Sequence, residues 1–340
     1  MKRILFTLTA LVFGIAYSFA DTRQVVMLFH QGTGTEYAYD QLQQALDDAT
    51  AGDTLYLNDG DYPINGDALT ISHPVSIIGM GINTRLLGSV DISIPDSVTL
   101  TSYLLDALRV NGDVRVQQPV NGLKYRKCWF NGTLVWNATT RDAQIDRCYI
   151  NNFDSSTKLN SANVINCKMF RENITSNNIG NNVLFINCAI NNIIVYIGNS
   201  SVGHKIGYSY STYMNCIIYN LTTSPSPGIY SLGDSQIRYS SYYNSALNNS
   251  LYNNEKVGIK ENCYMLDNYT LDWEQNNGCN LTQEELIERG FLGTDGTVVG
   301  PEGGSAPYTL IPSGISVRES KLTIDGENRT LNVRLKLTSN

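Results

Sequence analysis

The chain has 340 residues, 24 of them basic and 31 acidic, with a net charge of −7 and only 16% charged residues. It has no evident stripe of Lys and Arg, which argues against nucleic acid and anionic membranes as partners. Asn, Ser, Thr, Gly and Tyr are abundant, as is common in extracellular β proteins. No apolar run after the first 20 residues is long enough to span a bilayer, so we expect no transmembrane segment.

The first 20 residues have the pattern of an export signal. Lys2 and Arg3 supply a positive start, residues 4–16 form an apolar run, and residues 18–20 (Ser-Phe-Ala) form a small-x-small cleavage site. No Cys follows the cleavage site, so lipid attachment there is not expected. The predicted mature protein, residues 21–340, is therefore secreted, periplasmic or displayed on the cell surface.

The segment after the leader predicts one short helix among short strands. The runs VVMLF (25–29) and TLYL (54–57) are expected to be strands. Between them lies an amphipathic helix that Gly52 ends, and its apolar face carries Tyr39, Leu42, Leu46 and Ala49. Residues 58–60 (Asn-Asp-Gly) predict a turn. Further short strands are expected at residues 69–71, 75–79 and 90–94.

The stretch ALDDATAGDTLYLNDGDYPI, followed by LTISHPVSIIGMG, resembles the opening of right-handed parallel β-helix proteins of the pectin-lyase-like superfamily. Residues 52–55 (Gly-Asp-Thr-Leu) and 60–62 (Gly-Asp-Tyr) match the start of the first coils in that family. The resemblance implies an all-β fold, a single right-handed parallel β-helix whose open N-terminal end is capped by the amphipathic helix. It also suggests a secreted bacterial protein.

A repeat of about 20 residues supports this fold independently. It is marked by cysteines in similar short strings, at steps of 20, 19, 21 and 28 residues: Cys128, Cys148, Cys167, Cys188 and Cys216. A fixed period of this size indicates a solenoid, with coils stacked about 4.8 Å apart through parallel ladders. Each Cys shares a face with the residue two later, while the apolar residue three earlier is out of phase. Each repeat therefore contains a bend.

We interpret the five repeat cysteines as small buried hydrophobic residues stacked in a column. Disulfides are the alternative for an exported chain, and Cys263 and Cys279 are then the favoured pair. Seven cysteines is an odd number, so at least one thiol stays free or pairs between molecules. The spacing does not suggest a zinc site. Asparagines after the apolar pair suit turns and can bond one another between coils: Asn131, Asn151, Asn152, Asn191, Asn192 and Asn220.

The C-terminal part changes character. Residues 282–289 predict a capped helical turn, with Thr282 as N-cap and Glu285 three residues later. The glycine-rich residues 293–314 resemble the last-coil segment of secreted bacterial β-helix proteins. We expect the β-helix with its cap to span residues 21–305 and a strand module to span 306–340. Its strands predict a hairpin that covers the open last coil; the alternative is a secretion or attachment element.

The sequence shows few signs of a catalytic site. Hydrolases of this fold need two or three carboxylates on adjacent strands, and calcium-dependent lyases need several carboxylates and a base. Between Glu172 and Asp234 the chain has no Asp or Glu. His204 has no accompanying carboxylate and reads as a loop histidine. No cofactor is indicated; calcium would be the candidate ion, but no residue pattern calls for it.

Charged residues instead cluster in the earlier coils. Arg126 and Asp146 occupy the same repeat position in successive coils, which predicts an ion pair between coils, and Lys127 and Arg147 stack beside them. We favour a structural charge ladder. In the alternative, enzymatic interpretation, Asp146 is the acid or ligand and Arg147 or Lys127 is the base.

Tyrosines are plentiful where carboxylates are missing. An aromatic ring with a polar tip, beside amides and hydroxyls, suits a glycan-binding surface, for which the candidates are Tyr196, Tyr208, Tyr210, Tyr242 and Tyr243. Tyrosine is also a good strand former, which is the structural alternative. Tyr213 fits an inward position.

These observations lead to three functional hypotheses. The first is an exported, non-catalytic β-helix protein that binds a glycan or a cell-surface partner along its flank. The second is a polysaccharide lyase or glycoside hydrolase with an atypical site. The third is a structural spacer or adhesin.

Overall fold

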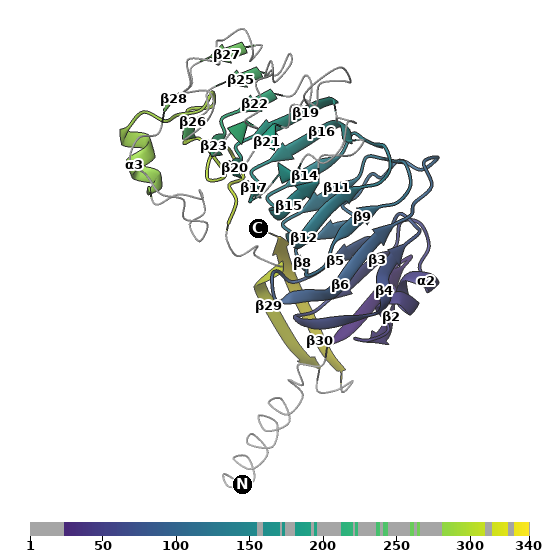
Figure 1. Cartoon of the computed structure of the whole chain (residues 1–340). Helices are drawn as coiled ribbons and strands as arrows, with labels where there is room; N and C mark the ends of the chain where they lie inside the picture. The colour runs from purple at the N-terminus through teal and green to yellow at the C-terminus, as the bar shows by residue number, and fades with distance from the viewer. Residues whose placement is uncertain are drawn as a thin grey trace, which may run out of the picture.

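The computed structural model is a β-solenoid in which the chain winds through stacked, parallel coils (Figure 1). The structure describes residues 24–154, 159–170, 172–173, 181–191, 194–195, 212–219, 222–223, 236–238, 241–243, 259–261, 264–265, 281–309, 315–325 and 330–339. The parallel β-helix expected from the sequence is confirmed. The expected leader, residues 1–20, lies outside the described residues.

Two long sheets run the length of the solenoid, and equivalent strands of successive coils pair in parallel within each. The first sheet contains, in order, β2 (Thr33–Ala38), β1 (Val25–His30), β3 (Thr54–Leu57), β5 (Ser76–Ile78), β7 (Leu105–Asp106), β11 (Lys124–Arg126), β14 (Gln144–Asp146), β16 (Leu159–Ile165), β19 (Asn181–Ile186), β22 (Thr212–Met214), β25 (Gln236–Arg238) and β27 (Ile259–Glu261), with β10 (Val120–Asn121) and β13 (Thr140–Arg141) beside them.

The second sheet is built from the strands that follow the turn in each coil. It contains β4 (Gly60–Ile71), β6 (Thr84–Ile92), β8 (Arg109–Val110), β12 (Trp129–Trp136), β15 (Tyr149–Asp154), β17 (Lys168–Met169), β20 (Ala189–Asn191), β23 (Ile217–Tyr219), β26 (Ser241–Tyr243) and β28 (Tyr264–Met265), with β9 (Val114–Val116) and β18 (Glu172–Asn173) beside them. Two further strands, β21 (Ile194–Val195) and β24 (Thr222–Thr223), pair with each other.

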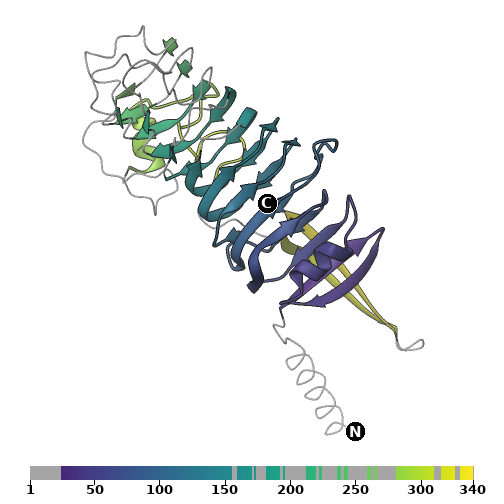
Figure 2. The same cartoon turned by 45° about the vertical axis from the view of Figure 1, so that its right-hand side comes forward.

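The N-terminal end is closed by α2 (Leu42–Asp48) and the antiparallel strands β1 and β2 (Figure 2). Leu42, Leu46 and Ala49 are buried as the amphipathic pattern predicted. Tyr39 is 45% exposed, so the prediction that it lies on the apolar face of the helix was wrong. It precedes the helix by three residues, and Ala45 occupies the buried face instead.

The bend in each coil lies at the residue immediately before the repeat Cys. This residue has a left-handed backbone, with φ between 50° and 56°, at Lys127, Arg147, Asn166, Asn187 and Asn215. Ala107, which precedes Leu108 at the same place in the coil before Lys127, has φ 51°. The turn lets the apolar residue three before the Cys and the Cys itself both point inward, as Val164 and Cys167 do. The predicted bend is confirmed.

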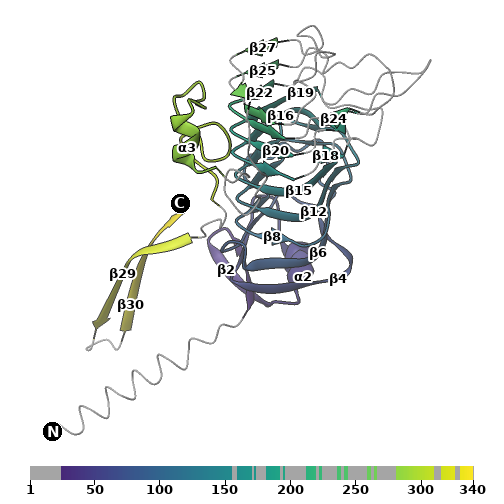
Figure 3. The ribbon, with the colours of Figure 1, turned by 60° about the vertical axis from the view of Figure 1, so that its left-hand side comes forward.

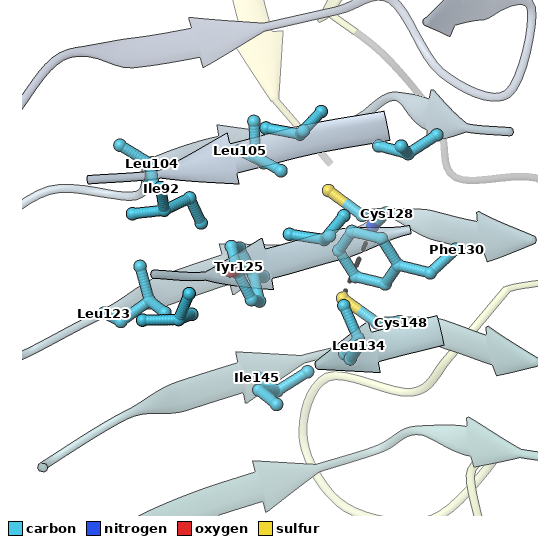
Figure 4. Close-up of a cluster of buried hydrophobic side chains, with 14 of the residues drawn as sticks. Ile92, Leu104, Leu105, Leu123, Tyr125, Cys128, Phe130, Leu134, Ile145 and Cys148 are labelled. Atoms are coloured by element: carbon cyan, nitrogen blue, oxygen red, sulfur yellow. Dashed lines mark hydrogen bonds between the residues drawn. The ribbon is translucent and has the colours of Figure 1, made fainter. Parts of the chain in front are cut away.

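The five repeat cysteines form a buried column of free thiols, as predicted. Sulfur atoms link neighbouring coils: the N–H of Cys128 donates to Sγ of Cys148 at 3.4 Å, and that of Cys148 to Sγ of Cys167 at 3.3 Å. Large side chains such as Tyr125 and Phe130 fill the space around the column (Figure 4). Tyr213 is also buried, and its ring stacks on Phe185. Cys263 and Cys279 lie outside the described residues.

The buried column predicts unreactive thiols. All five sulfur atoms are buried away from the solvent. Burial also raises the pKa of the Cys148 and Cys188 thiols well above the ordinary value, whereas hydrogen bonds with these two neighbours lower the pKa of Cys167; the thiolate is the nucleophile. We expect iodoacetamide to leave all five repeat cysteines unlabelled in the native protein and to label them fully in guanidinium, as read by peptide mass spectrometry. Labelling of Cys148 in the native protein would contradict this assignment.

The C-terminal part begins with α3 (Gln283–Glu288). Its predicted capping box is confirmed: Thr282 Oγ1 accepts from the N–H of Glu285 at 3.2 Å, and the N–H of Thr282 donates to Glu285 Oε2 at 2.7 Å. None of the described helices has the length and apolar content needed to cross a lipid bilayer.

The predicted terminal hairpin is formed by β29 (Ile315–Asp325) and β30 (Thr330–Ser339), which, among the described strands, pair with each other alone. It lies towards the end of the solenoid that carries α2, far from β27 and β28 (Figures 1 and 3). Its expected role in covering the last coil is therefore not what the structure shows. The segment before it turns back along the solenoid and carries the hairpin away from that end.

Candidate functional site

The charged residues singled out from the sequence meet on the outer side of the bend. β7, β11 and β14 pair in register, so Asp106, Arg126 and Asp146 form one column across three coils. Lys127 and Arg147 follow in the left-handed turns. Lys127, Asp146 and Arg147 are thus neighbours, as the enzymatic interpretation requires.

The predicted ion pair between Arg126 and Asp146 is wrong in its partner. Arg126 pairs with Asp106 in the preceding coil, where its Nε donates to Oδ1 at 3.0 Å and its Nη2 contacts Oδ2. Asp146 pairs with Arg147 of its own coil, whose Nη2 and Nε donate to Asp146 Oδ2 at 2.7 and 3.1 Å. Each aspartate is thus held by one guanidinium, and the register alone could not tell which neighbour an arginine reaches.

The same arrangement recurs elsewhere, which supports a structural ladder. Arg85 pairs with Asp61 at 2.5 Å, and Arg115 with Asp91 at 2.6 Å, in each case between register partners of adjacent coils. The aspartate lies in the earlier coil both times, as Asp106 does. Exposed pairs of this kind contribute about 0–1 kcal/mol each, so the ladder aligns coils more than it stabilises them.

Lys127 is the unusual member of the cluster. It is only 8% exposed, and none of the described carboxylates forms an ion pair with it. Burial lowers its pKa, and the positive charges of Arg147 and Arg126 lower it further. An amine of lowered pKa is a better proton acceptor near neutral pH. However, Ala107, Arg147 and the three asparagines at the same place in other coils share its left-handed backbone, so the backbone is no sign of a special role.

The carboxylates of this cluster suit a glycosidase poorly. Asp106 and Asp146 are two coils apart, about 9.6 Å along the solenoid axis at the spacing of paired strands. This is at the far limit for the carboxyl pair of an inverting glycosidase and about twice the separation in a retaining one. Arg126 lies between them and is held over the Tyr103 ring, 4.4 Å from its centroid. No group of His, Cys, Asp or Glu among the described residues is arranged to hold a metal ion.

A second outward surface lies one strand further on, across β8, β12 and β15. Trp129 and Tyr149 are register partners whose rings stack 4.2 Å apart at 22°, and both are partly exposed. Beside them runs an amide ladder, in which Asn131 Nδ2 donates to Asn111 Oδ1 at 3.1 Å and Asn151 Nδ2 donates to the Asn131 carbonyl at 2.7 Å. We call Trp129, Tyr149, Asn111, Asn131 and Asn151 the aromatic–amide face.

An amide–amide bond between coils, as predicted for the asparagines, is present at Asn131, whereas Asn151 bonds the main-chain carbonyl of Asn131. The aromatic residues of this face were missed. A signal was present, because Trp129 and Tyr149 both follow a repeat Cys directly and must face outward when that Cys faces inward. The tyrosines proposed instead are not placed: Tyr196, Tyr208 and Tyr210, with His204, lie outside the described residues. Tyr242 and Tyr243 lie in β26, but their side chains are outside the described set.

Comparisons with known proteins do not assign the chain to a family. No protein-family model matches it, and neither the curated proteins nor the solved structures searched give a significant match.

Proposed function

We propose that the protein is an exported, non-catalytic β-helix protein that binds a glycan, or a glycan-bearing surface partner, along its flank. The observation that carries the proposal is the aromatic–amide face, where two stacked rings lie beside a ladder of asparagine amides. Aromatic rings contact the apolar faces and edges of sugars, and amides bond their hydroxyl groups. The regular coil spacing repeats these contacts along one line, which suits an extended chain molecule.

The pairing of the charged cluster supports binding over catalysis. Asp106 and Asp146 are each hydrogen-bonded to an arginine, so both carboxylates already bond to donors of the protein itself. Lys127 is the observation that favours the second function, a lyase in which its amine is the base. A calcium-dependent lyase also needs carboxylates to hold the ion that neutralises an acidic substrate, and the described residues contain no group arranged to hold a metal ion.

A glycan array with product detection tests the proposal. We expect the mature protein to bind without bond cleavage, and Trp129→Ala and Tyr149→Ala to weaken binding about tenfold, or about 1.4 kcal/mol. Tyr56→Ala is the matched control, since Tyr56 is a 38% exposed aromatic residue on the N-terminal cap. Equal loss in the control, or no loss in either variant, would remove the aromatic–amide face from consideration.

The same wells separate the alternatives. Loss of binding in a Tyr208/Tyr210 double alanine variant alone would place the site on those tyrosines. Cleavage of an acidic or neutral polysaccharide that disappears in Lys127→Met and Asp146→Asn would establish the enzyme and overturn the proposal.

A further inference from the structure

After the last described coil, residues 281–309 turn back and run along the row of left-handed turns (Figure 3). We call this segment the clasp, and the row of residues that precede the repeat cysteines the ridge. Thr294 and Gly300 of the clasp meet the ridge at Asn215, while Pro301 and Gly303 meet it at Asn166. The clasp therefore runs back along the solenoid, and it meets the later coil at Asn215 before the earlier coil at Asn166.

Asparagine side chains supply the polar contacts. Asn166 Nδ2 donates to the carbonyls of Pro301 and Gly303 at 2.9 and 2.7 Å, and it is buried. Asn215 accepts from the N–H of Thr294 at 3.0 Å and donates to Thr294 Oγ1 at 3.2 Å. Asn187 lies between them, is only 4% exposed and lies beside Gly304. These bonds join the ridge to residues far away in the sequence, so they attach the clasp to the coils and do not stabilise the left-handed turn itself.

Apolar contacts add to the polar ones. Ala189 and Ile217 follow their cysteines and point out of the solenoid, yet both are fully buried. They form a second core with the clasp residues Leu281, Leu286, Phe291, Val298 and Val299. The fit is close, because a Cβ on Gly300 would lie 2.6 Å from Ile217 Cδ1.

The distribution of asparagine along the ridge separates two explanations. Asparagine tolerates the left-handed region better than most residues, so the turn alone could account for it. However, Ala107, Lys127 and Arg147 adopt the same conformation without it. Within the described part of the ridge, the asparagines occupy the coils that the clasp contacts, and two of them bond it directly.

We propose that the ridge at Asn166, Asn187 and Asn215 is a binding site for an extended, glycine-rich peptide segment, and that the clasp is its resident occupant. The asparagine amides recognise backbone carbonyls and N–H groups, and Ala189 and Ile217 receive apolar side chains. The site adjoins the aromatic–amide face, since Tyr308 of the clasp lies beside Lys168, the register partner of Tyr149. The inference does not depend on the proposed function.

Substitution by glycine isolates the side chains, because glycine keeps the left-handed turn. In an Asn166→Gly/Asn187→Gly/Asn215→Gly variant, we expect amide hydrogen exchange in residues 291–309 to rise at least tenfold while the coil amides stay protected. The matched controls are Lys127→Gly and Arg147→Gly, which change the same turn outside the clasp and should leave exchange there unchanged. Equal effects in variant and controls would overturn the proposal, as would loss of coil protection together with the clasp.

A clasp-side variant covers the case in which the triple variant fails to fold. Gly300→Asp leaves the ridge intact but directs a charged side chain at Ile217, so it should release the clasp. A fluorescein-labelled peptide of residues 291–309 should then bind this variant, by anisotropy, and not the wild type, whose site is occupied. Absence of peptide binding to a Gly300→Asp variant with a released clasp would refute the binding site. A rise in molecular mass on mixing would instead identify a second copy's clasp as an occupant.

Discussion

Gly132→Ala is expected to destabilise the solenoid by about 3 kcal/mol, at the upper end for an overpacked site. Gly88, Gly112 and Gly132 lie above one another in successive coils. A Cβ on Gly132 would overlap the carbonyl group of Gly112 and lie 2.7 Å from the N–H nitrogen of Asp113. These obstacles are backbone atoms, so no rotamer change relieves the overlap, and the coils must separate and weaken their ladder.

Urea unfolding followed by circular dichroism measures this effect. Gly34→Ala is the matched control, because the nearest atoms there are the ends of flexible side chains, Met27 Sδ at 3.2 Å and the Phe29 ring at 3.4 Å. We expect the control to lose less than about 1 kcal/mol. A Gly132→Ala midpoint equal to that of the control would show that the coils adjust to the extra methyl group.

Trp136→Ala is expected to cost about 3–5 kcal/mol, the range for removing a large aromatic side chain from a core. Trp136 is 1% exposed, and its ring contacts Phe153 of the next coil at a centroid distance of 6.0 Å. The cavity would open between two coils, where the stacked strands prevent the walls from collapsing.

The control lies in the same strand. Trp129, at the other end of β12, faces outward and is partly exposed, so Trp129→Ala should cost about 1 kcal/mol or less in the same urea titration. A comparable loss in the two variants would mean that the outward tryptophan is structural, which would also weaken its proposed role in glycan binding.

Features that repeat along the chain were predicted well, because each copy must pack against the next. The cysteine column, the strand at 54–57 and the bend before each Cys follow from period and alternation alone. Local hydrogen bonding likewise predicted the capping box at Thr282.

Features that depend on contacts between distant segments were not predicted. The partner of Arg126 is decided by side-chain reach, since carboxylates lie in the coils before and after it. The return of the clasp to Asn166 joins residues 135 and 137 positions apart, and no periodic pattern marks it. The candidate tyrosines were chosen by composition, whereas the position after each Cys pointed to Trp129 and Tyr149.

The returning path of the chain also determines how the molecule would bear tension. Tyr308, near the end of the clasp, is buried beside Lys168, with the lysine Nζ 5.7 Å from its ring centroid. A force applied between residues 24 and 309 would therefore enter the solenoid at Lys168 and pass through the coils that precede it. The coils of Cys188 and Cys216 lie beyond that point, so they would carry load only after the clasp had peeled from the ridge.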